Sequence, residues 1–164
     1  MSAEPDARVF SDSRVRCFRI PHAGKGAALN FGAARARAEL LCFIDQDDIM
    51  LPGRLERQVL AMRSNRSADA VYSDYERVFD DGRFIDRFVS RQATGGECLR
   101  AMATDLALVT MQTIMIRRDA FRRIGGFSED PALTGLDDAE FFARLFVSGA
   151  KLHYEPGAVQ QWIR

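Results

Sequence analysis

Several residue types and patterns are scarce in this 164-residue chain, and each scarcity excludes a class of protein. Cysteine occurs three times, as Cys17, Cys42 and Cys98, an odd number without CxxC spacing. This usage argues against a disulfide framework or a zinc site and favours a reduced, cytoplasmic location. The two histidines, His22 and His153, stand alone, without the spacing of a metal-binding pair such as HExxH. We therefore expect both histidines to be structural or surface residues.

Long hydrophobic runs are also lacking. No apolar segment approaches the roughly 20 residues of a membrane span, and the polar N-terminus does not have the pattern of a signal peptide. Charge of one sign is not in excess, because 23 basic residues balance 23 acidic ones. The balance indicates neither nucleic acid nor an anionic membrane as a partner. The length suits one domain with a real core.

The chain does contain an alternation of predicted strands and helices, which is typical of an α/β domain. Residues 1–13 are polar, and we predict that they are flexible. The apolar patterns predict strands at 15–20, 40–44, 70–73, 110–116 and 151–154, and helices at 27–38, 52–63, 97–103, 119–124 and 138–147. An Asp-Asp-Gly turn at 80–82 is predicted to join two short extended segments.

The most informative segment is residues 40–48, where the apolar run Leu-Leu-Cys-Phe-Ile is followed by Asp-Gln-Asp-Asp. Such a run predicts a strand buried on both faces, as in a parallel sheet. Ligands of open α/β sheets lie beyond the carboxyl ends of these strands. Mg²⁺ or Mn²⁺ is the simplest group to neutralise clustered carboxylates there. We predict that Asp45 and Asp47 bind the metal, whereas Asp48 caps the helix that begins near Pro52.

A second motif, Gly24-Lys25-Gly26, opens a helix made of small residues. The backbone N–H groups of a helix start could accept a phosphate. The motif matches neither a P-loop nor a dinucleotide fingerprint, because no Ser or Thr follows Lys25 and Leu29 stands where a third glycine is needed. Tight packing of the helix on a strand explains the small residues equally well.

A second acidic pair, Asp137-Asp138, lies at the start of a predicted helix after a loop rich in turn formers. Acidic residues at a helix start need no functional explanation, since they complement the helix dipole. Together with the upstream carboxylates, however, the pair becomes a candidate general base. The Gly125-Gly126 pair also allows two interpretations: a helix C-cap, or a close backbone approach to a ligand.

These motifs, in this order, closely resemble the family 2 glycosyltransferases, whose domain has the GT-A fold. The family has a basic or glycine-led helix carrying an asparagine and a glycine, here Asn30 and Gly32. An apolar strand ending in Asp-x-Asp-Asp then follows, matched by residues 45–48. The likeness extends through residues 72–75, 115–118 and 125–127 to the acidic helix at 137–144. It covers about residues 14–164.

The resemblance implies an α/β GT-A domain, with a mixed sheet flanked by helices, and a nucleotide-diphosphate sugar as the donor. Asp47 would bind the divalent metal that holds the diphosphate, and Asp45 would contact the ribose or assist the metal. Asp138 would deprotonate the acceptor hydroxyl, with Asp137 standing where the family often has glutamate. A base attacking from the face opposite the leaving diphosphate gives inversion.

Three further positions are assigned to the nucleotide sugar by the same resemblance. They are Lys25, Asn30 and Gly126. The acceptor would be a saccharide, a lipid-linked compound or another hydroxyl compound. The implied location is cytoplasmic, or peripheral to the inner face of the membrane.

One departure from the family pattern affects the whole sheet. The match begins at the family's third strand, so we expect the domain at 14–164 to be partial and to lack the first two strands. Val15–Ile20 would then lose its neighbours, and Leu40–Ile44 would have a bare apolar edge. We expect either that Val15–Ile20 moves beside Leu40–Ile44, or that two copies complete each other's sheets as a homodimer. Affinity for nucleoside diphosphates should be weak or absent, because the base-reading segment lies in the missing part.

Three functions compete. The first is a metal-dependent inverting glycosyltransferase, and the second is a non-catalytic, truncated GT-A domain. The third is a haloacid-dehalogenase-like phosphohydrolase, whose strand also ends in Asp-x-Asp. The phosphohydrolase hypothesis fails on two points. Its catalytic lysine should lie between the acidic motifs, where all the basic residues are arginines, and Ile49 stands where Thr or Val is expected.

Overall fold

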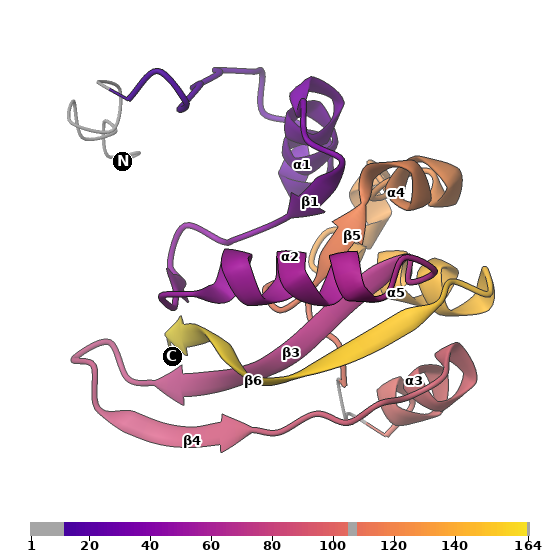
Figure 1. Ribbon diagram of the computed structural model, residues 1–164. Coiled ribbons are helices and arrows are strands. Elements are labelled where there is room, and N and C mark those ends of the chain that lie inside the picture. Colours follow the sequence, from indigo (N-terminus) through magenta and orange to yellow (C-terminus); the bar gives the residue numbers. More distant parts are fainter. Residues whose placement is uncertain (1–11, 105–107, 164) are drawn as a thin grey trace.

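A computed structural model describes residues 12–104 and 108–163, and it shows a mixed sheet flanked by helices (Figure 1). The strands run in the order β1-β5-β3-β6-β2, and β4 pairs with the outer part of β3. Only β3 and β6 are parallel neighbours; the other pairs are antiparallel. The strands are β1 (Leu40–Cys42), β2 (Ile49–Met50), β3 (Ala70–Val78), β4 (Phe84–Phe88), β5 (Met115–Arg117) and β6 (Leu152–Ile163).

Two layers of helices cover the sheet, because side chains of a strand alternate between its faces. Ala70 and Tyr72 of β3 belong to the large core cluster, with residues of α1, α3, α4 and α5. Val71, between them, belongs to a small cluster beneath α2 on the other face. The helices are α1 (Gly24–Arg35), α2 (Arg54–Ser64), α3 (Gly95–Met102), α4 (Arg118–Ile124) and α5 (Asp137–Val147), with a 3₁₀ turn at Pro131–Leu133.

Local chemistry explains where several helices begin and end. The hydroxyl of Thr94 accepts from the N–H of Glu97, whose carboxylate accepts from the N–H of Thr94, so a capping box starts α3. At the end of α4, Gly125 has a φ of 92°, a left-handed conformation that glycine adopts without strain. The predicted C-cap at this glycine is therefore confirmed.

The predicted strand at Val15–Ile20 is wrong. These residues form no strand, and all but Ile20 are exposed. A strand needs a hydrogen-bonding neighbour, and none of the described strands lies beside this segment. It therefore does not move in beside Leu40–Ile44. Of the segment 1–13 that we predict to be flexible, residues 1–11 lie outside the described residues.

The prediction of a doubly buried parallel strand at 40–44 is also wrong. Only Leu40–Cys42 is a strand; it pairs antiparallel with β5, and Ile44 is 41% exposed. Among the described strands β1 has this one neighbour, so it stands at the end of the sheet with a free outer edge. The apolar run is long enough for a central strand, but it does not reveal how many neighbours the strand has.

The centre of the sheet is longer than the sequence predicts. β3 continues past Asp74 to Val78, and β6 runs through Pro156 and Gly157, with its register against β3 shifting there. The register shift allows a strand to contain a proline, which cannot donate a ladder hydrogen bond. The predicted turn at 80–82 is confirmed, since the N–H of Gly82 donates to the carbonyl of Phe79.

Candidate functional site

Three carboxylates converge in the loop between β1 and β2. The N–H of Asp48 donates to the carbonyl of Asp45 at 3.3 Å, and this turn brings the side chains of Asp45, Asp47 and Asp48 together. One carboxylate oxygen from each lies within 4.8 Å of the others. Like charges this close are unfavourable unless a cation or a proton is shared among them. The turn therefore gathers the oxygen donors that a hard divalent cation prefers.

Lys25, near the start of α1, joins this cluster to the second acidic pair. Its Nζ lies 3.1 Å from Oδ2 of Asp45 and 3.2 Å from Oδ2 of Asp138. Burial alone would lower the pKa of Lys25, but the carboxylates of Asp138 and Asp45 raise it above its ordinary value. One ammonium group thus holds together carboxylates that lie 93 positions apart in the chain.

The environment of Asp138 suits a group that takes up a proton. Burial raises the pKa of this carboxyl, and the charge of Lys25 opposes the rise. Asp137 and Asp45 add negative charge nearby, which also raises the pKa. A carboxylate whose pKa is raised holds a proton more readily than an ordinary aspartate does, as a general base must.

Asp48 does not cap α2, contrary to the prediction. The residue that precedes α2 is Gly53, and the helix has no side-chain cap. Oδ2 of Asp48 instead accepts from Nε2 of Gln160 in β6 at 2.8 Å. Burial, together with the charges of Asp45 and Asp47, raises the pKa of Asp48 to about 6.

A buried arginine, Arg54, holds in place the segments around residues 45–48. Arg54 is 1% exposed, and its Nη1 donates to Oε1 of Gln160 at 2.7 Å. Its Nη2 donates to the carbonyls of Phe43 and Ile114, at the ends of the strands that flank the site. The same guanidinium therefore ties α2, β6 and the segment leading to the carboxylates into one unit.

Several carboxylate oxygens of the site are buried without a partner. Within the described part of the chain these are Oδ1 of Asp48, Oδ2 of Asp137 and Oδ1 of Asp138. Buried polar atoms are nearly always hydrogen-bonded, so an orphaned oxygen calls for a donor or a cation. Hard oxygen donors and a local excess of negative charge fit Mg²⁺ or Mn²⁺.

Beside Asp138 lies a pocket of 610 Å³ between the start of α1 and the loop that precedes α5. Asp137 and Asp138 line it at the start of α5, opposite Gly24 and Lys25. The 128–135 loop supplies the remaining wall. The second acidic motif therefore lies in the wall of a pocket that is large enough for a small molecule, and Lys25, in the same wall, joins it to Asp45.

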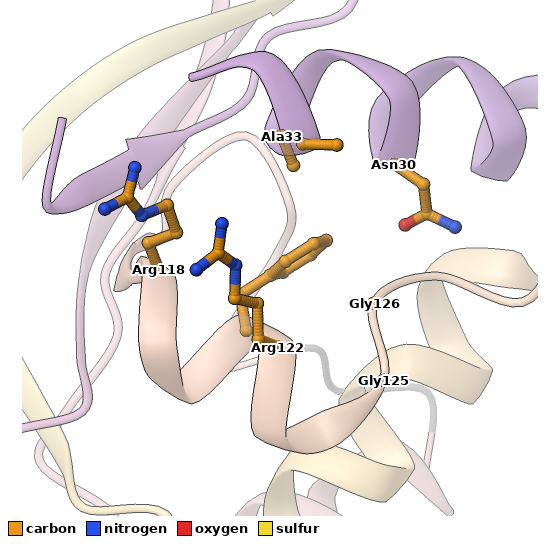
Figure 2. A pocket seen from close by; sticks show the side chains of 8 residues that line it. Asn30, Ala33, Arg118, Arg122, Gly125 and Gly126 are labelled. Carbon is orange, nitrogen blue, oxygen red and sulfur yellow. The ribbon is translucent and has the colours of Figure 1, made fainter. Parts of the chain in front are cut away.

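Asn30 and Gly126 lie together, but not with the carboxylates. Oδ1 of Asn30 accepts from the N–H of Phe127 at 2.9 Å, and a Cβ at position 126 would stand 2.5 Å from that oxygen. Both residues line a separate pocket of 390 Å³ between α1 and α4, toward which Arg118 and Arg122 extend (Figure 2). Asn30 thus connects α1 to the turn after α4 through hydrogen bonds. The contacts of Asn30 and Gly126 with a nucleotide stay a prediction.

Three residues that position the site have no motif in the sequence. Gln112 donates to Oδ2 of Asp45 at 2.8 Å from 67 positions away, and Gln160 and Arg54 support Asp48 in the way described above. Glutamine and arginine carry no motif of their own here. The only available signal is the apolar surroundings of each polar residue, as in Thr-Met-Gln112-Thr-Ile-Met.

Comparison with known proteins gives a consistent result. The model of the family described as glycosyl transferase family 2 matches residues 3–125. An uncharacterised glycosyltransferase of Haemophilus influenzae is 26% identical over 124 residues, which cover 74% of this chain and 40% of the relative. The Escherichia coli protein WfgD, named UDP-Glc:alpha-D-GlcNAc-diphosphoundecaprenol beta-1,3-glucosyltransferase, is 31% identical over 84 residues, 51% of this chain and 32% of WfgD. The chain thus spans less than half of each relative.

Solved structures agree on the fold. TarS 1–349 of S. aureus, in complex with UDP, superposes with a TM-score of 0.65 at 16% sequence identity, covering 87% of this chain and 40% of TarS 1–349. The same TarS fragment in complex with UDP-GlcNAc gives a TM-score of 0.64. These are GT-A folds, as the sequence resemblance predicts. With a family model that matches well over half of its length, the chain belongs to glycosyl transferase family 2.

Proposed function

We propose that residues 14–164 form part of a GT-A domain that transfers a sugar, with inversion, from a nucleotide-diphosphate donor to an acceptor hydroxyl. The observation that carries the proposal is the bridge made by Lys25. Its ammonium contacts Asp45, beside the candidate metal ligands, and Asp138, the candidate base, at 3.1 and 3.2 Å. The groups that would hold the leaving group and activate the attacking one are therefore joined by a single ammonium group.

Asp47 and Asp45 would hold Mg²⁺ or Mn²⁺, with Asp48 close enough to contribute an oxygen. The orphaned Oδ1 of Asp48 supports this assignment, because the chain itself leaves that buried oxygen without a donor. When bound, the cation neutralises the charge that develops on a leaving diphosphate. Gln112 and Gln160 orient the carboxylates of Asp45 and Asp48 by donating to one oxygen of each.

Asp138 would act as the base. Its Oδ1 accepts the proton of the acceptor hydroxyl while that hydroxyl oxygen forms a bond to the anomeric carbon. The bond from the anomeric carbon to the diphosphate oxygen breaks, and its electron pair leaves with the diphosphate. Lys25 keeps the carboxylate of Asp138 in place through Oδ2, and it stands close enough to the candidate metal site to attract the diphosphate as well.

The acceptor is a hydroxyl compound, and the name of WfgD supports a lipid-linked one as a candidate class. We propose a cytoplasmic location, peripheral to the inner face of the membrane. Cys17, Cys42 and Cys98 are all free thiols, as is usual in a reducing compartment. None of the helices in the described part of the chain has the length and apolar character of a membrane span.

We also propose that the free edge of β1 pairs with a second copy of the chain. Beside this edge runs a groove of 930 Å³, lined by Leu40, Cys42 and Val59 among others. Glu56 and Arg63 of α2 are seven residues apart and so lie on the same side of the helix. An antiparallel, two-fold arrangement of the β1 strands would bring Arg63 of each copy toward Glu56 of its partner.

Metal and nucleotide titrations test the proposed function. We expect the protein to bind Mn²⁺, measured by the loss of the free-ion electron paramagnetic resonance signal, and Asp47→Ala to abolish the binding. Asp80→Ala, in the exposed turn after β3, is the matched control and should bind as the parent does. Unchanged Mn²⁺ affinity in Asp47→Ala would show that the assignment is wrong.

The same protein distinguishes the competing functions. Weak UDP or GDP binding that requires Mn²⁺ supports the transferase, whereas no metal or nucleotide binding supports the non-catalytic domain. Phosphatase activity would support the phosphohydrolase, which the family match leaves without support. For the dimer, sedimentation should detect a pair that Val59→Arg dissociates and that Phe84→Arg, exposed on β4 and outside the groove, preserves. A monodisperse monomer at high concentration would contradict the dimer.

A further inference from the structure

The pocket of 390 Å³ between α1 and α4 has basic residues in its wall and no acidic ones. Two arginines of α4, Arg118 and Arg122, extend toward it (Figure 2). No aspartate or glutamate is among the described residues that line it. The two other pockets described above do contain acids, Glu39 in the groove beside β1 and Asp137 in the pocket at the start of α5. This pocket therefore carries positive charge that its own wall does not balance.

The two arginines lie on the same side of α4. Positions 118 and 122 are four residues apart, a spacing that makes their side chains neighbours on a helix surface, and like charges at this spacing destabilise the helix. Arg123, the next residue, forms an ion pair with Asp69. In the described part of the chain, neither Arg118 nor Arg122 has such a partner. An anion held between the two arginines would replace their mutual repulsion by attraction.

Most hydrogen-bond donors of these two side chains are unused. Nη1 of Arg118 donates to the carbonyl of Ala36 at 2.9 Å, while its Nε is buried without a partner. Arg122 is exposed, and its side chain makes no hydrogen bond to any residue that the structure describes. A guanidinium group carries several N–H donors and no acceptor, so the pair can only be satisfied further by an acceptor from outside.

A phosphoryl group matches the donors of this pair better than a carboxylate does. The planar fork of an arginine donates to two oxygens of a phosphate or a carboxylate at once. A carboxylate has a single charge and oxygens for one such fork. A phosphate monoester carries about −1.5 to −2 charge at pH 7 and has three acceptor oxygens, so it can accept from both arginines and balance both charges.

The rest of the pocket wall suits a small organic group attached to that phosphate. Ala33 of α1 and Phe121 of α4 line the pocket with apolar surface, and both residues are buried. Gly125 and Gly126 also line it, without side chains that would fill the space. The volume of 390 Å³ lies at the lower end of the usual range for small-molecule sites, and a phosphate ion alone would occupy only part of it.

We propose that the pocket between α1 and α4 binds a phosphate monoester that carries a small apolar group. Arg118 and Arg122 donate to the phosphoryl oxygens, and the organic group packs against Ala33 and Phe121. The site is separate from the candidate catalytic site, because this pocket shares no lining residue with the pocket beside Asp138 and none of the candidate metal ligands lines it. Binding here requires neither the metal nor the proposed transferase activity.

Titration of the full chain with phenyl phosphate tests the proposal. The titration is run at constant ionic strength with EDTA present, and NMR follows the backbone signals of Gly125 and Gly126. We expect a dissociation constant on the order of 1 mM, with inorganic phosphate roughly threefold weaker or more because it lacks the apolar group. Phenol, which lacks the phosphoryl group, should bind at least about tenfold more weakly. No binding of phenyl phosphate, or equal binding of phenol, would overturn the proposal.

The arginine variants separate a specific site from general attraction of an anion. Arg122→Gln should weaken phenyl phosphate by about tenfold or more, because hydrogen bonds to a charged group are lost. Arg100→Gln is the matched control: it removes the same charge from an exposed position at the end of α3, outside the pocket, and should leave the affinity unchanged. Arg118→Gln should also weaken binding, but it loses the hydrogen bond to Ala36 as well. Unchanged affinity in Arg122→Gln, or equal weakening by Arg100→Gln, would contradict the site.

The same phosphoryl chemistry occurs in soluble phosphate esters and in the headgroup of an acidic phospholipid, and vesicles distinguish the two sources. The protein is sedimented with vesicles of phosphatidic acid and phosphatidylcholine, and with vesicles of phosphatidylcholine alone. Association with the acidic vesicles that Arg122→Gln removes would assign the site to a lipid headgroup, and phenyl phosphate binding without such association would assign it to a soluble ester. Asp47→Ala should bind phenyl phosphate as the parent does, since Asp47 does not line the pocket. Binding that requires Mn²⁺ and Asp47 would place the phosphate at the carboxylates and overturn the proposal.

Discussion

Asp74 and the aspartates of the candidate site differ in how many hydrogen-bond donors the chain supplies to their oxygens. Asp74, in the middle of β3, is 2% exposed, and four donors reach its two oxygens. The N–H of Ser90 and the hydroxyl of Tyr154 donate to Oδ1, and the N–H of Gly157 and the guanidinium of Arg87 donate to Oδ2. This carboxylate ties β3 and β6 to the segment that follows β4.

Near α5 and the β1–β2 loop, by contrast, several aspartate oxygens have no hydrogen-bond donor. Asp137 is nearly as buried as Asp74, but one of its oxygens has no donor, and Asp48 and Asp138 each have such an oxygen too. Burial alone therefore does not distinguish Asp74, which holds strands together, from the aspartates proposed for the site. The difference lies in whether the protein itself supplies every partner.

The first prediction removes the basicity of Asp138, one of the aspartates with an unpartnered oxygen. Asp138→Asn preserves the side-chain shape but cannot take up the hydroxyl proton, so transfer in an active form of the domain should fall by about 10²–10⁴-fold. Release of nucleoside diphosphate from a panel of nucleotide sugars measures the loss. Stability to urea should change little, and parent-like turnover would rule out the role of Asp138 as the base.

The second prediction concerns Asp74, whose two oxygens accept four hydrogen bonds. Asp74→Ala removes the acceptor of four hydrogen bonds and leaves buried N–H groups unpaired, so the free energy of unfolding should fall by about 3 kcal/mol. Urea denaturation measures this, with Asp80→Ala as the exposed control. A loss no greater than that of the control would mean that the β3–β6 network does not hold the sheet together.

The third prediction concerns Mn²⁺, which the cluster of Asp45, Asp47 and Asp48 is proposed to bind. Mn²⁺ at 100 times its dissociation constant should stabilise the protein by about 2.7 kcal/mol, because the cation binds the folded state. EDTA should reverse the gain, and Asp47→Ala should show none. The increase in melting temperature with added Mn²⁺ measures the effect, and an equal increase in Asp47→Ala would place the metal elsewhere.

The smallest expected effect comes from Glu97, a half-buried carboxylate that accepts several hydrogen bonds. Hydrogen bonds from the backbone and hydroxyl of Thr94, and from Arg91, lower the pKa of Glu97 to about 2. Because the folded pKa lies below the unfolded value, this stabilisation is present above about pH 4.5 and is lost as the pH falls toward 2. Glu97→Gln should therefore flatten the stability profile between pH 5 and pH 3. An identical profile in parent and variant would contradict the role of the capping box.

Local patterns in the sequence locate the two acidic motifs better than they locate the strands of the sheet. Residues 45–48 and 137–138 stand out because carboxylates after an apolar strand and at a helix start are local patterns, and the structure joins them through Lys25. The strand at 15–20 and the parallel strand at 40–44 were both expected from local patterns as well. They are wrong because a strand depends on hydrogen-bonding neighbours, which a local pattern does not specify.

The sequence by itself determines the α/β class, the family and the two acidic motifs. Each of these depends on residue types at short spacing, where the chain geometry of strands and helices dictates which side chains come together. Only the tertiary structure decides that Gln112, Gln160 and Arg54 support the carboxylates, and that Asp137 keeps an unpartnered oxygen at a pocket wall. Contacts across 67 to 112 positions depend on how the sheet and helices pack, and hydrogen-bond saturation can be counted only once every neighbour is in place.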